Sequence, residues 1–286
     1  MIRNISYHNH TVQVIVEGAG KPVLLLHGWP ANARLWQAQR DCLKDRFQVI
    51  TPDWLGFGQS DKPADHLYSF QSMKQILDEI VRQLHLEGEK LTIVAHDIGG
   101  PAAILWASEH QEKLSRLVML NTLFYDMQTP LDKLGHFIFG LPGINRLQMS
   151  NLGLKGLMLN LLNNKKKSGR TAIHEILQRH IPWPQQLRLK TILEPVDGEG
   201  RALLSSLAET FTCLAVEKYL VVAKQDPLCY RHMQKLQEQY PDIPAFTIKN
   251  CGHFIPIDQP EELNEILGQI LALPAGKAQT VSDGVV

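Results

Sequence analysis

A carboxylate at the apex of a glycine-rich turn is the feature that most constrains the fold of this chain. Residues 91–94 (Leu-Thr-Ile-Val) form a short apolar run typical of a buried strand, and residues 101–107 favour a helix. Between them lies Ala-His-Asp-Ile-Gly-Gly, in which Ala95 and Gly99 stand two residues before and two residues after Asp97. Bulky side chains at these two places would clash as the chain reverses. The pattern therefore predicts a sharp strand–turn–helix with Asp97 at its apex.

The side chain at this apex indicates a reaction class. Serine is the usual nucleophile at such a turn, whereas an aspartate is already ionised at neutral pH. An ionised carboxylate can displace a leaving group from a saturated carbon and form an alkyl ester with it. Asp97 is therefore the candidate nucleophile of a covalent reaction. The alternative is that it only caps the helix that begins near Gly99.

The length and charge of the chain limit the classes of function. A chain of 286 residues buries roughly three quarters of its unfolded surface, which fits one large core with an insertion. The 29 basic and 29 acidic residues give a formal net charge of zero, so no field favours a nucleic acid or an anionic membrane. We therefore expect neither of these as a partner.

Cysteine usage and the first residues indicate a reducing compartment. The four cysteines show no paired spacing, which is typical of free thiols: Cys42, Cys213, Cys229 and Cys251. Residues 1–10 contain no apolar stretch of the kind that directs secretion, so we expect a cytoplasmic protein. His27 and His96 lack a second ligand at the spacing of a zinc motif, and we expect no metal site.

Strand-like and helix-like segments alternate along most of the chain. Apolar strands separated by helices favour the α/β class, with a mostly parallel central sheet and helices on both of its faces. We predict strands at residues 11–17, 23–26, 47–51, 91–94, 117–120, 219–223 and 245–248, and helices at 36–43, 69–84, 101–110, 232–239 and 261–273.

The alternation stops in the middle of the chain. Residues 123–207 contain clustered glycines and prolines, and their apolar runs are interrupted too often by polar residues to span a bilayer. We predict a helical cap inserted here, between a first core part at 1–122 and a second at 208–273, with a polar tail at 274–286. Open α/β sheets bind ligands at the carboxyl ends of their strands, so we expect the cap to lie over that edge.

Several motifs resemble a known family. They are HGWP, DWLGFGQSDKP, VAHDIGGPAAILWA, RLVMLNT, VVAKQDP and CGHFIPIDQPEEL. Together they resemble the α/β-hydrolase fold, and in particular its branch of haloalkane dehalogenases and epoxide hydrolases with an aspartate nucleophile. The match covers residues 10–122 and 215–272 and is weak across the predicted cap. The GGP and LNT segments are most similar to haloalkane dehalogenases.

The resemblance implies a role for each of three residues. Asp97 matches the nucleophile, His253 the histidine that activates water, and Asp226 the carboxylate that orients this histidine and stabilises its cationic form. The order nucleophile, acid, histidine is the order this fold uses along the chain. Asp126, just beyond the strand at 117–120, is an alternative acid, because some dehalogenases place their acid there.

The resemblance also bears on the leaving group. Epoxide opening in this family uses cap tyrosines, and residues 123–207 contain only Tyr125. Most haloalkane dehalogenases have a tryptophan directly after the nucleophile, where this chain has Ile98. The backbone N–H groups of Trp29 and Ile98 match the donors to the oxyanion, and the indoles of Trp29 and Trp183 are candidate halide donors or packing residues.

We therefore expect a hydrolase that forms an alkyl–enzyme ester on Asp97 and cleaves a carbon–halogen bond. An epoxide hydrolase is the first alternative, and a non-catalytic small-molecule binding protein of the same fold is the second. The reaction requires no cofactor and no metal, and its partners are a small apolar organic substrate and water. The natural substrate and the oligomeric state stay open at this point.

Overall fold

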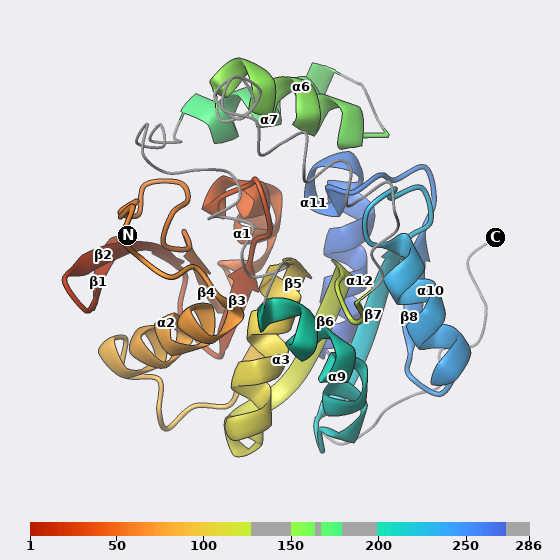
Figure 1. Cartoon of the computed structure of the whole chain (residues 1–286), viewed down its shortest axis with the longest axis horizontal. Coiled ribbons are helices and arrows are strands. Elements are labelled where there is room, and N and C mark those ends of the chain that lie inside the picture. The colour runs from red at the N-terminus through yellow and green to blue at the C-terminus, as the bar shows by residue number, and fades with distance from the viewer. Residues whose placement is uncertain (127–149, 164–166, 179–198, 273–286) are drawn as a thin grey trace.

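The computed structural model describes residues 1–126, 150–163, 167–178 and 199–272, and these residues form an α/β fold (Figure 1). Within them the sheet has eight strands, in the order β1 (Ile2–Tyr7), β2 (His10–Glu17), β4 (Gln48–Pro52), β3 (Pro22–Leu26), β5 (Leu91–Asp97), β6 (Leu114–Thr122), β7 (Glu217–Ala223) and β8 (Ala245–Ile248). The helices are α1 (Gln37–Leu43), α2 (Phe70–Gln83), α3 (Gly99–Glu109), α6 (Asn151–Leu161), α7 (Lys167–Gln178), α9 (Glu199–Cys213), α10 (Tyr230–Gln239), α11 (Ile255–Asp258) and α12 (Pro260–Ala272), with single 3-10 turns at Ala33–Trp36 and Gln111–Lys113.

The sheet is mostly parallel, as the sequence predicts. The six strands from β4 to β8 run parallel to their neighbours, while β2 pairs antiparallel with both β1 and β4. Every residue of β3 and β5 is buried, which explains why these strands have continuous apolar sequences rather than an alternating pattern. Helices cover both faces, with α1 against α12 and with α2 and α9 against α3 (Figure 1).

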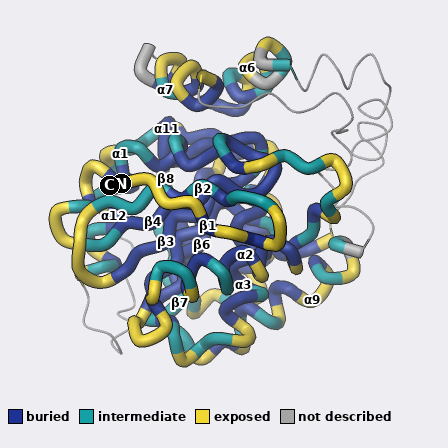
Figure 2. The backbone as a smooth tube through the Cα atoms, turned by 90° about the vertical axis from the view of Figure 1, so that its left-hand side faces the viewer, coloured by how far each residue is buried: buried dark blue, intermediate teal, exposed yellow. Residues whose placement is uncertain are grey.

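Strand β1 is an element that the sequence patterns did not predict. It is an edge strand with mostly polar residues, and only Ile5 and Tyr7 turn toward the core. Its remaining residues are exposed (Figure 2), so its sequence lacks the apolar pattern that marks a buried strand. Pairing with β2, rather than apolar content, makes it a strand.

The described part of the predicted cap is attached to the carboxyl-end loops of the sheet. Helices α6 and α7 lie above α1 and α11 (Figures 1 and 2). The carbonyl of Leu161, at the end of α6, accepts a hydrogen bond from the backbone N–H of His253 at 2.9 Å. The carbonyl of Ile176 in α7 accepts one from the side-chain amide of Asn32, also at 2.9 Å. Helix α6 therefore contacts the loop that carries His253, and α7 contacts the loop after β3 that carries Asn32.

The division at residue 207 and the tail at 274–286 stay predictions. Helix α9 continues without a break past residue 207 to Cys213, and residues 273–286 lie outside the described part of the chain. None of the helices within the described ranges has the length and apolar content needed to cross a membrane.

Candidate active site

Asp97 lies at the apex of a sharp turn between β5 and α3. It is the last residue of β5 and has a positive φ of 52°, and α3 begins two residues later at Gly99. A non-glycine residue rarely adopts this conformation, which is a mark of strained turns at functional sites. The turn predicted from the sequence is confirmed in this geometry, and it presents the Asp97 carboxylate above the carboxyl edge of the sheet.

Glycines on two neighbouring segments make room for this turn. A Cβ atom on Gly28, in the loop after β3, would overlap the Asp97 side chain, and a Cβ on Gly100 would overlap the Thr122 hydroxyl. Thr122 donates a hydrogen bond to the backbone carbonyl of Asp97 at 2.6 Å. The turn is therefore fixed by close backbone approach on one side and by β6 on the other.

The Asp97 carboxylate receives backbone donors. The N–H of Trp29 donates to Asp97 Oδ1 at 2.8 Å, and the N–H of Ile98 also donates to this carboxylate. Burial raises the pKa of Asp97, while the facing His253 charge and these two N–H groups act in the opposite direction. The donors therefore favour the ionised carboxylate that a nucleophile needs.

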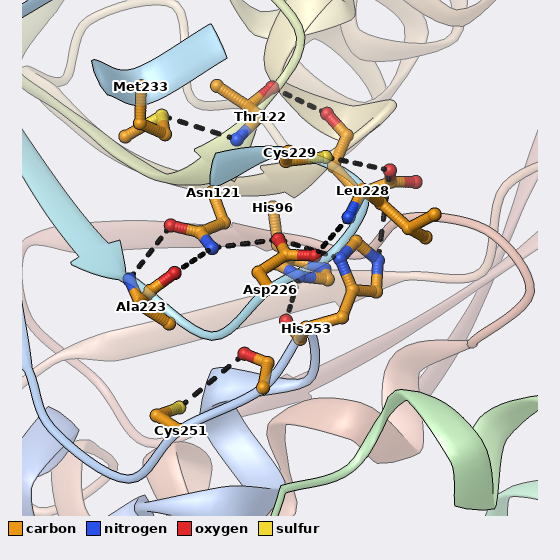
Figure 3. Close-up of polar contacts among 12 residues, drawn as sticks. His96, Asn121, Thr122, Ala223, Asp226, Leu228, Cys229, Met233, Cys251 and His253 are labelled. Carbon is orange, nitrogen blue, oxygen red and sulfur yellow. Dashed lines mark hydrogen bonds and ion pairs between the residues drawn. The ribbon is translucent and has the colours of Figure 1, made fainter. Parts of the chain in front are cut away.

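His253 and Asp226 form a buried pair (Figure 3), and His253 faces Asp97. His253 Nδ1 donates to Asp226 Oδ2 at 3.0 Å, and its other ring nitrogen, Nε2, lies 3.8 Å from Asp97 Oδ2. Burial alone would lower the pKa of His253, but the Asp226 charge and hydrogen bond raise it above the ordinary 6.5. Burial would raise the pKa of Asp226, but His253 lowers it to about 2. In this pair, Asp226 therefore stabilises the positively charged form of the His253 imidazole.

Asn121 holds Asp226 in place, a role that the sequence interpretation did not foresee. Its amide nitrogen donates to Asp226 Oδ2 at 2.7 Å and to the carbonyl of Ala223 at 3.0 Å, and its amide oxygen accepts from the N–H of Ala223 at 2.9 Å (Figure 3). Leu228 N–H donates to the second carboxylate oxygen of Asp226 at 2.8 Å. The LNT segment at the end of β6 was the available signal, but only the fold shows which residue its asparagine contacts.

Two further buried side chains lie close to Asp97 and His253. His96 Nε2 donates to the backbone carbonyl of His253 at 2.8 Å, and burial lowers the pKa of His96 to about 3, so it is a neutral supporting residue. Cys229 places its Sγ 3.6 Å from Asp97 Oδ2 (Figure 3). The sequence interpretation assigned no role to Cys229, because its distance from Asp97 along the chain hides their contact.

The other candidate residues differ in their exposure and in their hydrogen-bond partners. Asp126 is exposed, and Asp226 rather than Asp126 contacts His253. The Tyr125 hydroxyl donates to Gln239 of α10. Trp29 has a buried indole N–H without a hydrogen-bond partner among the described residues, whereas Ile98 is 4% exposed and apolar. Trp183 lies outside the described residues.

The family of the chain follows from its sequence as well as its fold. The sequence profile of the alpha/beta hydrolase fold family matches residues 21–260. The chain belongs to this family. The sheet order and the placement of Asp97 after a central strand agree with that membership, so the predicted fold class is confirmed.

Curated relatives are enzymes of the predicted branch. The chain is 36% identical over 269 residues to a cis-3-alkyl-4-alkyloxetan-2-one decarboxylase of Shewanella oneidensis, covering 91% of this chain and 84% of the relative. It is 25% identical over 259 residues to haloalkane dehalogenase 2 of Mycobacterium bovis, covering 88% of each. It is 26% identical over 272 residues to epoxide hydrolase 3 of Xenopus tropicalis, covering 87% and 71%. The chain is therefore an enzyme of the α/β-hydrolase fold with dehalogenase and epoxide hydrolase homologues.

Proposed function

We propose that Asp97 is a nucleophile that forms an ester with a saturated carbon of the substrate, with Asp226 and His253 as its acid and histidine partners. The observation that carries this proposal is their convergence from the end of β5 and from the loops after β7 and β8. Asp226 Oδ2 accepts from one ring nitrogen of His253 at 3.0 Å, and the other ring nitrogen faces Asp97 Oδ2 at 3.8 Å. A carboxylate at this position, in place of a hydroxyl, suits substitution at carbon.

We propose that the substrate is a β-lactone with alkyl groups on both ring carbons, a cis-3,4-dialkyl oxetan-2-one. The decarboxylase relative is 36% identical over nearly all of this chain, against 25% for the dehalogenase relative. A strained lactone ring also offers what Asp97 needs, which is a saturated carbon bonded to a good leaving group. The leaving carboxylate stays attached to the substrate through the ring carbon at position 3.

The proposed reaction has two steps that balance without water. An Asp97 oxygen bonds to ring carbon 4, the bond from carbon 4 to the ring oxygen breaks, and the ring oxygen becomes part of a carboxylate on carbon 3. The bond from carbon 3 to this carboxylate then breaks and releases CO₂, its electron pair forms the alkene, and the ester oxygen leaves carbon 4 to restore the Asp97 carboxylate. Inversion in the first step and anti elimination in the second convert a cis lactone into a cis alkene.

His253 and the backbone donors supply the electrostatics of these steps. The cationic form of His253, which Asp226 favours, faces the Asp97 carboxylate that departs in the second step. The N–H groups of Trp29 and Ile98 donate to the same carboxylate. Fixed donors in a buried site stabilise developing negative charge without reorganising, which lowers the barrier to the second step, in which Asp97 regains its charge.

The test is a product screen with the wild-type protein and Asp97→Asn. A cis-3,4-dialkyl oxetan-2-one, a bromoalkane and an epoxide are incubated in parallel, and alkene, CO₂, β-hydroxy acid, bromide and diol are measured. We expect alkene and CO₂ in equal amounts from the lactone, with loss of both in Asp97→Asn. A β-hydroxy acid without alkene would contradict the elimination step, and diol as the main product would assign the chain to the epoxide branch.

A haloalkane is the second candidate substrate, and Trp29 is the observation that favours it. Its indole N–H is buried and unpartnered among the described residues, while its backbone N–H holds Asp97. A halide ion leaving Asp97-bound carbon would accept a hydrogen bond from this indole, and His253 would then activate water to hydrolyse the ester. Trp29→Phe removes one donor, worth about 1 to 3 kcal/mol, so bromide release should fall about 5-fold to 150-fold. Unchanged bromide release would contradict this role.

A further inference from the structure

Cys229 brings a thiol into the centre that holds Asp97 and His253. Its Sγ lies 3.6 Å from Asp97 Oδ2, and His253 Nε2 lies 3.8 Å from the same oxygen. One ligand atom from each of the three residues lies within 4.8 Å of the other two, and all three residues are buried. Local spacing in the sequence gives no metal motif, because these residues come from three separate parts of the chain that only the fold brings together.

His253 Nε2 is the second observation that points to a ligand. This atom is fully buried and has no hydrogen-bond partner among the described residues, although it faces Asp97 and Cys229. The opposite ring nitrogen donates to Asp226, which is itself held by Asn121. A histidine whose far nitrogen is fixed by a carboxylate is the arrangement that metal-binding histidines have in proteins.

We propose that Asp97, Cys229 and His253 form a binding site for Zn²⁺, and that Zn²⁺ bound there inhibits the enzyme. Zn²⁺ binds sulfur at about 2.3 Å and nitrogen or oxygen at about 2.0 to 2.2 Å in a tetrahedron, so its ligand atoms lie roughly 3.3 to 3.6 Å apart. The separations of 3.6 Å and 3.8 Å from Asp97 Oδ2 are close to these values. Cys229 Sγ and His253 Nε2 lie within 4.8 Å of each other, so binding needs these two atoms to approach, and a water molecule would supply the fourth ligand.

Charge balance favours a divalent cation in this buried place. Binding releases the proton of the Cys229 thiol and any Nε2 proton of His253, so a thiolate and the Asp97 carboxylate offset the two positive charges of Zn²⁺, while His253 Nδ1 keeps its hydrogen bond to Asp226. The imidazole of His253 binds in its neutral form through Nε2. The soft thiolate makes Zn²⁺ preferable to Mg²⁺ or Ca²⁺, which prefer oxygen ligands.

Inhibition follows from the atoms that the metal occupies. A bound ion engages the Asp97 carboxylate, which can then no longer attack carbon, and it occupies the nitrogen of His253 that faces the reacting groups. This consequence rests on the proposed function, because it assumes that Asp97 is the nucleophile. Binding of Zn²⁺ itself does not, and it can be measured without any substrate.

The test compares Cys229→Ser with Cys251→Ser, a matched control with a second buried thiol. Cys251 donates to the carbonyl of Gly252 rather than to Asp97. Calorimetric titration with ZnCl₂ should show one tight site in the wild type and Cys251→Ser, and at least about 100-fold weaker binding in Cys229→Ser, because even ligand-supporting residues change affinity 10-fold to 100-fold. The exposed Cys42 and Cys213 are present in all three proteins and cancel from the comparison.

A spectroscopic measurement keeps the proposal testable if Cys229→Ser does not fold. Co²⁺ replaces Zn²⁺ in tetrahedral sites, and a thiolate ligand gives it a near-ultraviolet charge-transfer band. We expect this band in wild-type protein titrated with CoCl₂, and its loss in Asp97→Ala. Equal Zn²⁺ affinity in Cys229→Ser and wild type, or a wild-type Co²⁺ spectrum without a thiolate band, would overturn the proposal. Zn²⁺ binding without loss of turnover would instead contradict the role of Asp97.

Discussion

Replacing Asp226 with asparagine should lower the pKa of His253, because it removes the charge that favours the protonated ring. Burial raises the pKa of Asp226, but His253 lowers it from 3.8 to about 2. At 1.36 kcal/mol per pKa unit, the net lowering of the Asp226 pKa corresponds to roughly 2 to 3 kcal/mol, and the same charge pair favours the protonated imidazole. In the variant the Asp226 charge is gone, and burial, which lowers the pKa of His253, is then opposed by the Asp97 charge. The amide nitrogen of the new side chain also faces either His253 or the N–H of Leu228, both of which are donors.

The assay is NMR titration of the histidine rings across the neutral pH range. The resonance of His253 is assigned by its absence from His253→Gln, and Asp126→Asn is the matched control because Asp126 is exposed and follows β6. We expect a large downward pKa change in Asp226→Asn and little change in Asp126→Asn. A pKa of His253 that falls in Asp126→Asn but not in Asp226→Asn would refute the reasoning and place the acid after β6.

Two more predictions follow from the same geometry. Hydrolysis of a bromoalkane needs neutral His253 to take a proton from water. Because the pKa of His253 is raised, the rate in a pH–rate profile should fall with decreasing pH around a midpoint above 6.5. A midpoint below 6.5 would contradict the pairing of His253 with Asp226. Gly28→Ala should lower the rate of ester formation about 100-fold, because its Cβ would overlap Asp97 and displace it, whereas Gly88→Ala, with open space around its Cβ, should match wild type in single-turnover kinetics.

Most of the sheet could be predicted from the sequence because its inner strands are buried on both faces. Strand β8 was predicted at its observed residues 245–248, and the strand predicted at 219–223 is the buried part of β7. Strand β1 could not be predicted in this way, because its stability comes from pairing and its outward side chains are polar. Periodicity detects burial, so it misses an edge strand that buries little.

For the candidate site too, the sequence predicts only features that are local in the chain. The turn at Asp97 could be predicted because its small neighbours are adjacent in sequence. The contacts of Asn121 with Asp226 and of Cys229 with Asp97 join residues that are 105 and 132 positions apart. No local pattern records such contacts, since they depend on the order of β5, β6 and β7 in the sheet.

The most direct test of the central claim is to identify the residue that becomes alkylated. His253→Gln is incubated with a bromoalkane, and the protein is measured by intact mass and then by peptide mapping, with Asp97→Asn as the control. Because hydrolysis of an ester formed from a haloalkane needs His253 to activate water, the ester should accumulate in His253→Gln, with the added alkyl mass on the peptide that contains Asp97 and no adduct in the control. An adduct on Cys229, or an adduct that persists in Asp97→Asn, would contradict the assignment of Asp97 as the nucleophile.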